Sequence, residues 1–182
     1  MTDIASDTIL AEQYRAGDRT ALAELYRRHR PGLFRFCLRL LRDRDSAEDA
    51  VQSTFLKLQA GSAPPVRSGS VKSWMYAVAR NESFGELRRR RSEPLDEETV
   101  WNGPPPDEAL AAKDRNAAVM AALDALYPSF REVIVLREFE QLSYDEIAAV
   151  TGTTVPSVKS RLFKARKAMA GALTSLISEE RR

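Results

Sequence analysis

The segment from Leu142 to Lys167 constrains the fold of this chain most, because its residues predict two short helices joined by a tight turn. Ser143 and Glu146 have the spacing of a capping box, so the first helix is expected to begin there. Gly152 lies in a Thr-Gly-Thr turn, where glycine permits the sharp change of direction. Thr154 can then cap the second helix. This pattern indicates a helix-turn-helix unit near the C-terminus.

The second helix has one apolar face and one basic face. Apolar residues recur at steps of four, three and four: Val158, Leu162, Ala165 and Met169. The positions between them carry five cations and no acid within the segment. A basic helix face alone usually indicates only contact with solvent. Together with the capped turn, however, it favours a helix-turn-helix that binds DNA.

Charge is distributed unevenly along the 182 residues, although the net charge is only +2. Residues 1–91 carry +6, residues 92–114 carry −6, and residues 115–182 carry +2. Residues 92–108 contain four prolines and six acids, a composition that predicts a flexible acidic linker. We therefore expect two small domains, residues 1–91 and 109–182, joined by the linker 92–108.

The apolar periodicity is helical in both parts, and no stretch alternates like a strand, so the predicted fold class is all-α. In the N-terminal part we expect helices at 8–16, 19–29, 46–58 and 71–91, with another helix beginning after Pro31. Tyr26 is expected to face inward, and Asp45 with Glu48 offers a cap for the helix at 46–58. Residues 59–70 read as a loop rich in Gly, Pro and Ser.

The residue counts exclude several classes of protein. One cysteine, Cys37, cannot form an intramolecular disulfide, and with the single His29 it cannot complete a zinc site. Neither a signal peptide nor a membrane-spanning run is evident. We expect a soluble cytoplasmic protein without cofactor, metal or catalytic residues. His29 is expected at the surface and Cys37 in the core.

Two blocks of the sequence resemble the bacterial extracytoplasmic-function (ECF) sigma factors. The C-terminal block contains LSYDEIA at 142–148 and VKSRLFKAR at 158–166. The N-terminal block contains AEDAVQSTFLK at 47–57, SWMY at 73–76 and ARN at 79–81. Order, spacing and length agree over nearly the whole chain. The resemblance implies a factor that binds core RNA polymerase and directs initiation at promoters with minus-10 and minus-35 elements.

The resemblance also implies roles for particular residues of the N-terminal part. The helix at 46–58 would dock on the coiled coil of the polymerase β′ subunit, and the C-terminal domain would meet the β flap. The docking residues would be Asp49, Gln52, Ser53, Leu56 and Lys57. The minus-10 element would be contacted by Arg80, Asn81, Arg88 and Arg89, with Asn81 reading a base edge. The loop at 59–70 has no aromatic residue on which a flipped base could stack.

For the C-terminal part, the resemblance places the second helix of the helix-turn-helix in the major groove of the minus-35 element. The residues concerned are Ser157, Lys159, Ser160, Arg161, Phe163, Lys164, Arg166 and Lys167. Lys159 can donate to guanine acceptors, and Phe163 can contact a thymine methyl group. Arg161, Arg166 and Lys167 are expected to contact phosphates, which position a protein without specifying sequence.

Many ECF sigma factors are held by an anti-sigma factor, and such a partner is expected here. The main alternative is a helix-turn-helix regulator that binds duplex DNA without polymerase, which would need neither the helix at 46–58 nor the acidic linker. A nucleic-acid enzyme is the second alternative. Its candidate carboxylates, Glu48 with Asp49 and Asp145 with Glu146, are adjacent in sequence and do not converge on one face.

Overall fold

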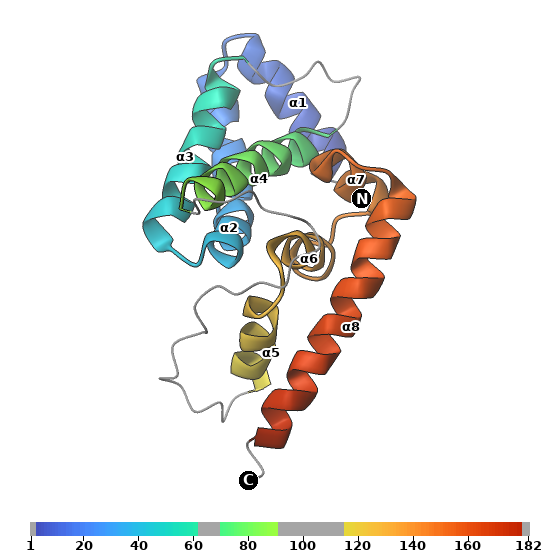
Figure 1. Cartoon of the computed structure of the whole chain (residues 1–182). Helices are drawn as coiled ribbons and strands as arrows, with labels where there is room; N and C mark the ends of the chain where they lie inside the picture. Colours follow the sequence, from blue (N-terminus) through green and yellow to red (C-terminus); the bar gives the residue numbers. More distant parts are fainter. Residues whose placement is uncertain (1–2, 62–69, 91–114, 180–182) are drawn as a thin grey trace.

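The computed structural model describes residues 3–61, 70–90 and 115–179, and every regular element in these ranges is a helix (Figure 1). The predicted all-helical class is confirmed. The predicted linker at 92–108 lies outside the described residues. The elements, in chain order, are α1 (Asp3–Arg15), α2 (Arg19–Leu41), α3 (Arg44–Gln59), α4 (Val71–Arg90), α5 (Arg115–Asp124), α6 (Pro128–Ile134), the π-helix η2 (Val135–Phe139), α7 (Tyr144–Thr151) and α8 (Val155–Glu179).

Helix α2 is one continuous helix of 23 residues, so the predicted break at Pro31 is wrong. Proline removes one backbone hydrogen bond and crowds the preceding turn, which costs about 3 kcal/mol in a helix interior. Here Leu25 on one side of Pro31 and Leu33 and Phe36 on the other are fully buried. Packing on both sides of the proline therefore holds the two halves of the helix in line.

Two other local expectations for the N-terminal helices are corrected. The cap of α3 is Asp43 rather than Asp45, and its carboxylate accepts a hydrogen bond from the Ser46 amide at 2.8 Å. His29 is not a surface residue, since its side chain is 10% exposed and its Nε2 lies 2.8 Å from a buried carboxylate oxygen of Asp7. Ser70 caps the start of α4, because its hydroxyl accepts a hydrogen bond from the Ser73 amide at 3.0 Å.

The C-terminal helices contain the predicted helix-turn-helix. Ser143 and Glu146 form the capping box at the start of α7, and Gly152 ends that helix with a φ of 66°. This left-handed conformation is one that glycine adopts without strain. The expected apolar stripe of α8 faces inward, with Val158, Leu162 and Ala165 buried and Met169 packed against them. The turn and the orientation of α8 therefore follow from the sequence pattern.

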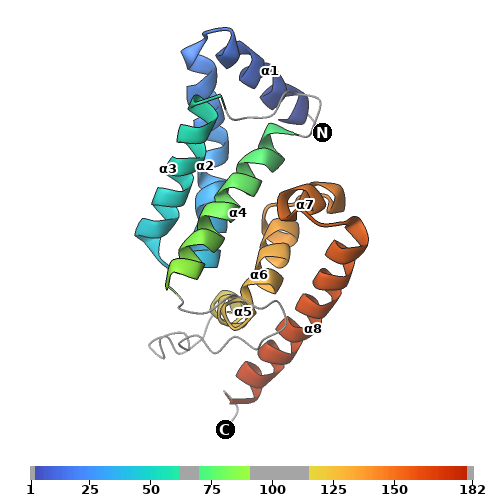
Figure 2. The same cartoon turned by 45° about the horizontal axis from the view of Figure 1, so that its top comes forward.

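The N-terminal helices α1–α4 and the C-terminal helices α5–α8 pack directly against each other (Figures 1 and 2). Helix α7 lies on α4 and helix α6 lies on α2, and the apolar core continues across both parts. Arg131 of α6 is buried and donates hydrogen bonds to Asp124 O of α5 at 2.6 Å and to Arg39 O of α2 at 3.2 Å. Burial lowers the pKa of Arg131 to about 10. One guanidinium thus ties the ends of two helices from the two parts.

Candidate polymerase and nucleic-acid interfaces

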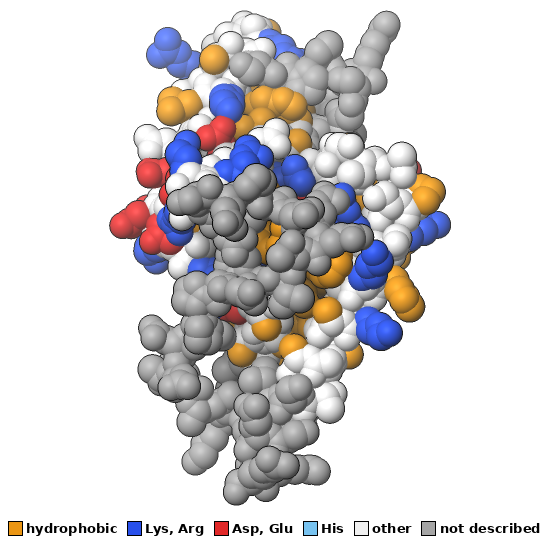
Figure 3. Space-filling view, viewed as in Figure 1, with side chains coloured by type: hydrophobic (Ala, Val, Ile, Leu, Met, Phe, Trp, Pro, Cys, Tyr) orange, Lys and Arg blue, Asp and Glu red, His pale blue; other side chains and the backbone are white. Residues whose placement is uncertain are grey.

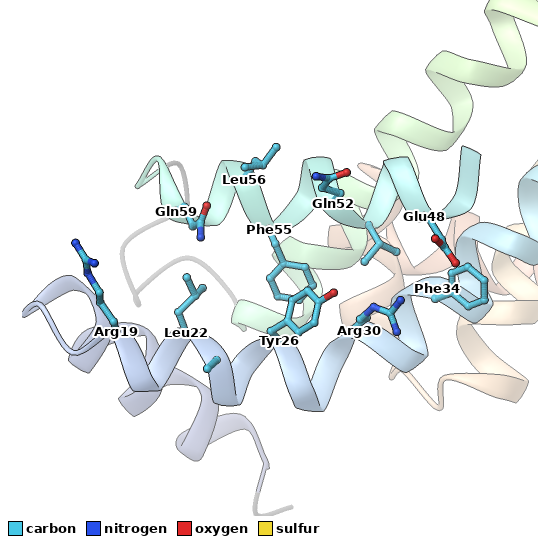
Figure 4. A pocket seen from close by; sticks show the side chains of 12 residues that line it. Arg19, Leu22, Tyr26, Arg30, Phe34, Glu48, Gln52, Phe55, Leu56 and Gln59 are labelled. Carbon is cyan, nitrogen blue, oxygen red and sulfur yellow. The ribbon is translucent and has the colours of Figure 1, made fainter. Parts of the chain in front are cut away.

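A groove of about 590 Å³ runs between α2 and α3 (Figure 4). Its floor is aromatic, because the rings of Tyr26 and Phe55 meet with centroids 4.7 Å apart. Leu56 on its edge is 56% exposed, which is unusual for a large apolar side chain. Arg19 and Arg30 stand toward its two ends. The groove therefore offers an apolar strip with cations along one side.

The five residues predicted to dock on polymerase divide into two groups. Gln52 and Leu56 line the groove. The others do not line it: Asp49 is exposed, Ser53 is half-buried, and Lys57 forms an ion pair with Glu82 of α4 at 2.5 Å. Both groups nevertheless lie on α3. The structure therefore brings only part of the predicted set to the groove.

The α2 side of the groove was missed in the sequence. Tyr26, expected in the core, is 43% exposed and forms part of the groove. Arg19, Arg30 and Phe34 complete that side. These residues are spaced by about one or two helical turns, which places them on one face of a helix. The sequence could show this shared face only if α2 were known to continue past Pro31.

The outer face of α8 matches the predicted minus-35 residues most closely. Phe163 is 71% exposed, although phenylalanine is normally a core residue. Around it Lys159, Ser160, Lys164 and Lys167 are exposed, while Ser157 in the first turn is half-buried. Figure 3 shows Lys or Arg side chains and hydrophobic side chains along the outer edge of this helix. The face is basic, apolar at its centre and open to solvent.

Two arginines of α8 that looked equivalent in the sequence lie in different surroundings. Arg166 is half-exposed and pairs with the exposed Glu138 at 2.7 Å. Arg161 turns toward the interior, with a side chain 16% exposed and Nη1 3.8 Å from Oε1 of the buried Glu132. Arg166 therefore remains at the accessible face, and Arg161 lies at its inner margin.

The predicted minus-10 residues lie along α4, but the Arg80 guanidinium is already paired with a carboxylate, that of Glu132. Its Nε donates to Glu132 Oε2 at 2.6 Å and its Nη2 to Glu132 Oε1 at 3.2 Å, a two-pronged pairing. The same guanidinium covers the Phe84 ring at 4.6 Å. By contrast Asn81 and Arg88 are exposed, and Arg89 pairs within its own helix with Glu86 at 2.7 Å.

A second buried carboxylate, Glu140 just after η2, meets the same side of the N-terminal helices. Tyr76 of α4 donates its hydroxyl to Glu140 Oε2 at 2.7 Å. Burial and the adjacent carboxylate raise the pKa of Tyr76, so its hydroxyl stays protonated and donates. Gly32 of α2 lies against this pair: a Cβ there would be 2.6 Å from the Tyr76 hydroxyl and 2.9 Å from Glu140 Oε2. We call the pairing of α2 and α4 side chains with Asp124, Glu132 and Glu140 the charged seam.

The described helices include none that is long and apolar enough to cross a membrane. Within the same ranges, no group of three or more His, Cys, Asp or Glu side chains is placed to hold a metal ion.

Family models match both parts of the chain. The Sigma-70 region 2 model matches residues 25–93, and the Sigma-70 region 4 model matches residues 116–169. The first match includes α3 and α4, and the second includes the helix-turn-helix. Most of the groove therefore lies in the first matched region, and the exposed α8 face lies in the second.

Two curated relatives match most of this chain. The RNA polymerase sigma factor SigV of Bacillus subtilis is 31% identical, over 80% of this chain and 87% of its own length. The ECF RNA polymerase sigma factor SigE of Mycolicibacterium smegmatis is 32% identical over 90% of this chain, which spans 66% of that relative. The chain belongs to the ECF sigma factors, which direct transcription initiation and have no catalytic chemistry of their own.

Two solved structures are similar to this one. A structure of CnrH in complex with the cytosolic domain of CnrY has a TM-score of 0.71 and 28% identity, covering 93% of this chain and 97% of that one. A co-crystal structure of the sigma factor RpoE with the anti-sigma factor NepR from Bartonella quintana has a TM-score of 0.59 and 30% identity, covering 79% and 91%. Both relatives were determined bound to a partner.

Proposed function

We propose that this sigma factor binds core RNA polymerase through the groove between α2 and α3, with the coiled coil of the β′ subunit as the occupant. The observation that carries the proposal is the exposure of Tyr26 and Leu56, two large apolar side chains that line the groove beside the buried Phe55 ring. An amphipathic helix can lay its apolar face into such a groove. Arg19 and Arg30 would then meet acidic side chains of the partner helix.

We assign the two promoter elements to different parts of the chain. Residues 1–91 would dock on polymerase and contact the minus-10 element through Arg80, Asn81, Arg88 and Arg89. Residues 109–182 would contact the β flap and the minus-35 element. In that second contact, Lys159, Ser160, Phe163 and Lys164 would read bases, and Arg166 and Lys167 would hold phosphates. Arg161, turned toward Glu132, would join only after moving outward.

Control by an anti-sigma factor is the regulatory part of the proposal. The similar RpoE structure contains an anti-sigma factor, and the CnrH structure, also bound to a partner, covers both parts of this chain. These similarities support an arrangement in which a partner holds the N-terminal and C-terminal helices of this chain together. The factor would then act in the cytoplasm once that partner releases it.

The experiment that tests polymerase docking is a binding titration of purified core polymerase with Leu56→Glu. A carboxylate at this exposed apolar position should weaken binding at least about tenfold, since desolvating it against an apolar partner is costly. Ile9→Glu on α1 is the matched control: Ile9 is similarly exposed, at 53%, and does not line the groove. Equal effects of the two substitutions, or none from Leu56→Glu, would place the docking site elsewhere.

A further inference from the structure

The sides of α2 and α4 that face the C-terminal helices are strongly cationic. Among the described residues, five cations lie at the charged seam: Arg35, Arg39 and Arg42 on α2, and Lys72 and Arg80 on α4. Three carboxylates of the C-terminal part form ion pairs with cations of this set: Asp124, Glu132 and Glu140. The N-terminal helices therefore contribute most of the cations of this seam, to which α8 adds Arg161 beside Glu132, and the C-terminal helices contribute its acids.

The pairing at the seam is uneven. Arg80 with Glu132 is well made, but Arg35 reaches Glu140 only at 3.7 Å, and Lys72 reaches only the Glu140 carbonyl oxygen at 3.4 Å. Nε and Nη1 of Arg39 are buried without a hydrogen-bond partner among the described residues, and so is Oε1 of Glu140. The Arg39 guanidinium lies instead over the Phe139 ring at 4.2 Å. Buried polar groups without partners weaken this packed arrangement.

The seam is also partly open. A cavity of about 410 Å³ separates α2 from α5 and is lined by Arg35, Arg39 and Arg42, with Asp124 opposite. Leu38 and Met120 form its apolar part. An anion entering this cavity would meet the cations of α2 before any helix unfolds.

The plain explanation of such a seam is adhesion between the two parts of the molecule. Adhesion alone would favour matched pairs, whereas here the cations outnumber the carboxylates and two buried guanidinium nitrogens of Arg39 have no hydrogen-bond acceptor among the described residues. A row of cations on two adjacent helices suits a ligand with charges at regular intervals, namely a nucleic-acid backbone. The two-pronged contact of Arg80 with Glu132 is also one that arginine makes with a phosphate.

We propose that Arg35, Arg39 and Lys72 extend the Arg80 surface into a binding site for the DNA sugar-phosphate backbone, and that Glu132 and Glu140 occupy this site in the packed arrangement. This inference rests on the proposed function, because it deepens the minus-10 contact assigned to α4. DNA and the C-terminal helices use the same cations and exclude each other. Binding of DNA at α4 therefore requires that the two parts of the molecule separate.

The test removes the competing carboxylates and measures DNA binding by the free protein. Glu132→Gln with Glu140→Gln keeps the side-chain shapes but abolishes both negative charges. We expect this variant to bind a fluorescent oligothymidylate of about 20 nucleotides about tenfold more tightly than the parent at about 50 mM salt. In that background, Arg35→Gln with Arg39→Gln should remove the gain. It should also reduce the slope of log affinity against log salt by about 1.4, or about 0.7 per lost phosphate contact.

A second route to the same result guards against a variant that fails to fold. Gly32→Ala changes no charge, but its Cβ would lie 2.6 Å from the Tyr76 hydroxyl and 2.9 Å from Glu140 Oε2, so these side-chain ends must move and their hydrogen bond across the seam should weaken. Oligothymidylate affinity should therefore rise as well. The control is Arg27→Gln in the carboxylate-free background. It removes one cation from the same helix, and its guanidinium pairs with Glu24 away from the seam. It should keep the full gain.

The outcomes separate this inference from the proposed function. If neither the double carboxylate variant nor Gly32→Ala binds oligothymidylate more tightly, or if Arg27→Gln reduces the gain as much as the Arg35 and Arg39 substitutions, the exchange model is wrong. Binding to core polymerase is measured separately with each variant. If the unsubstituted protein does not bind core polymerase, the groove proposal is wrong, and the conclusion about DNA binding is unaffected.

Discussion

The outer face of α8 leaves Lys159, Lys164 and Lys167 exposed, whereas the seam face of α4 holds Arg80 against a buried carboxylate. Both faces were predicted to bind DNA: the resemblance assigned residues on each helix, and the basic face of α8 with its capped turn supported the second assignment. The difference lies in what packs beside each helix. The apolar stripe of α8 is buried and most of the other described side chains of this helix face solvent. Helix α4, by contrast, packs against the C-terminal helices. A basic sequence pattern thus identifies cationic side chains, but it does not show whether they are free to contact DNA or are already paired within the protein.

The largest effect that would sharpen this comparison is expected from Glu132→Ala. It leaves Arg80 without its partner in a largely buried site, and breaking a buried pair in this way costs about 3–5 kcal/mol of unfolding free energy. Glu138→Ala is the control, because its pair with Arg166 is about half-exposed and should contribute less than about 1 kcal/mol. Urea unfolding measures both. Similar losses would show that the two faces do not differ as described.

The next effect concerns the open face. Lys159→Ala and Phe163→Ala should each change minus-35 preference by about 1–3 kcal/mol at one base pair, since each is assigned a base contact. The unfolding free energy should stay within about 0.5 kcal/mol of the parent, because both side chains are exposed. Binding of the holoenzyme to promoter variants provides the measurement. A uniform loss on every promoter would show that these residues do not read sequence.

Arg166→Ala should have a smaller and more even effect. A phosphate contact carries no sequence information, so affinity should fall equally on all promoters and the salt slope should decrease by about 0.9. Glu138→Gln should do the reverse and tighten DNA binding slightly, since Glu138 now holds this guanidinium at 2.7 Å. Promoter-dependent losses from Arg166→Ala would instead assign it a base contact.

The smallest expected effect is at Cys37, a buried residue of α2. Burial raises the pKa of its thiol to about 12, so at pH 8 the thiolate that reacts with maleimides is scarce and shielded. Gly32→Ala should leave Cys37 as slow to label as in the parent, because the seam separates while the N-terminal core stays packed. Rapid labelling of that variant would mean that opening the seam also unfolds α2. Urea-unfolded protein gives the reference rate.

The sequence predicted the elements whose cause is local. The Ser143–Glu146 capping box, the glycine turn and the α8 stripe depend on residues within a few positions of each other, and all three are confirmed. Pro31 misled because its helix is held by distant packing partners. Tyr26 misled because a groove exists only when a second helix stands beside the first. Arg161 and Arg166 have the same chemistry and differ only in which glutamate lies nearby.

Helix α2 has a consequence for how the proposed contacts communicate. Its 23 residues run unbroken past Pro31, with Arg19, Tyr26 and Phe34 in the groove and Gly32, Arg35 and Arg39 at the charged seam. A stiff rod shared by two interfaces acts as a lever, since a tilt imposed at one interface is felt at the other without any change within the rod. Polymerase seated in the groove would thereby apply torque to the seam. Pro31, where the sequence predicted a new helix to begin, lies within this continuous rod.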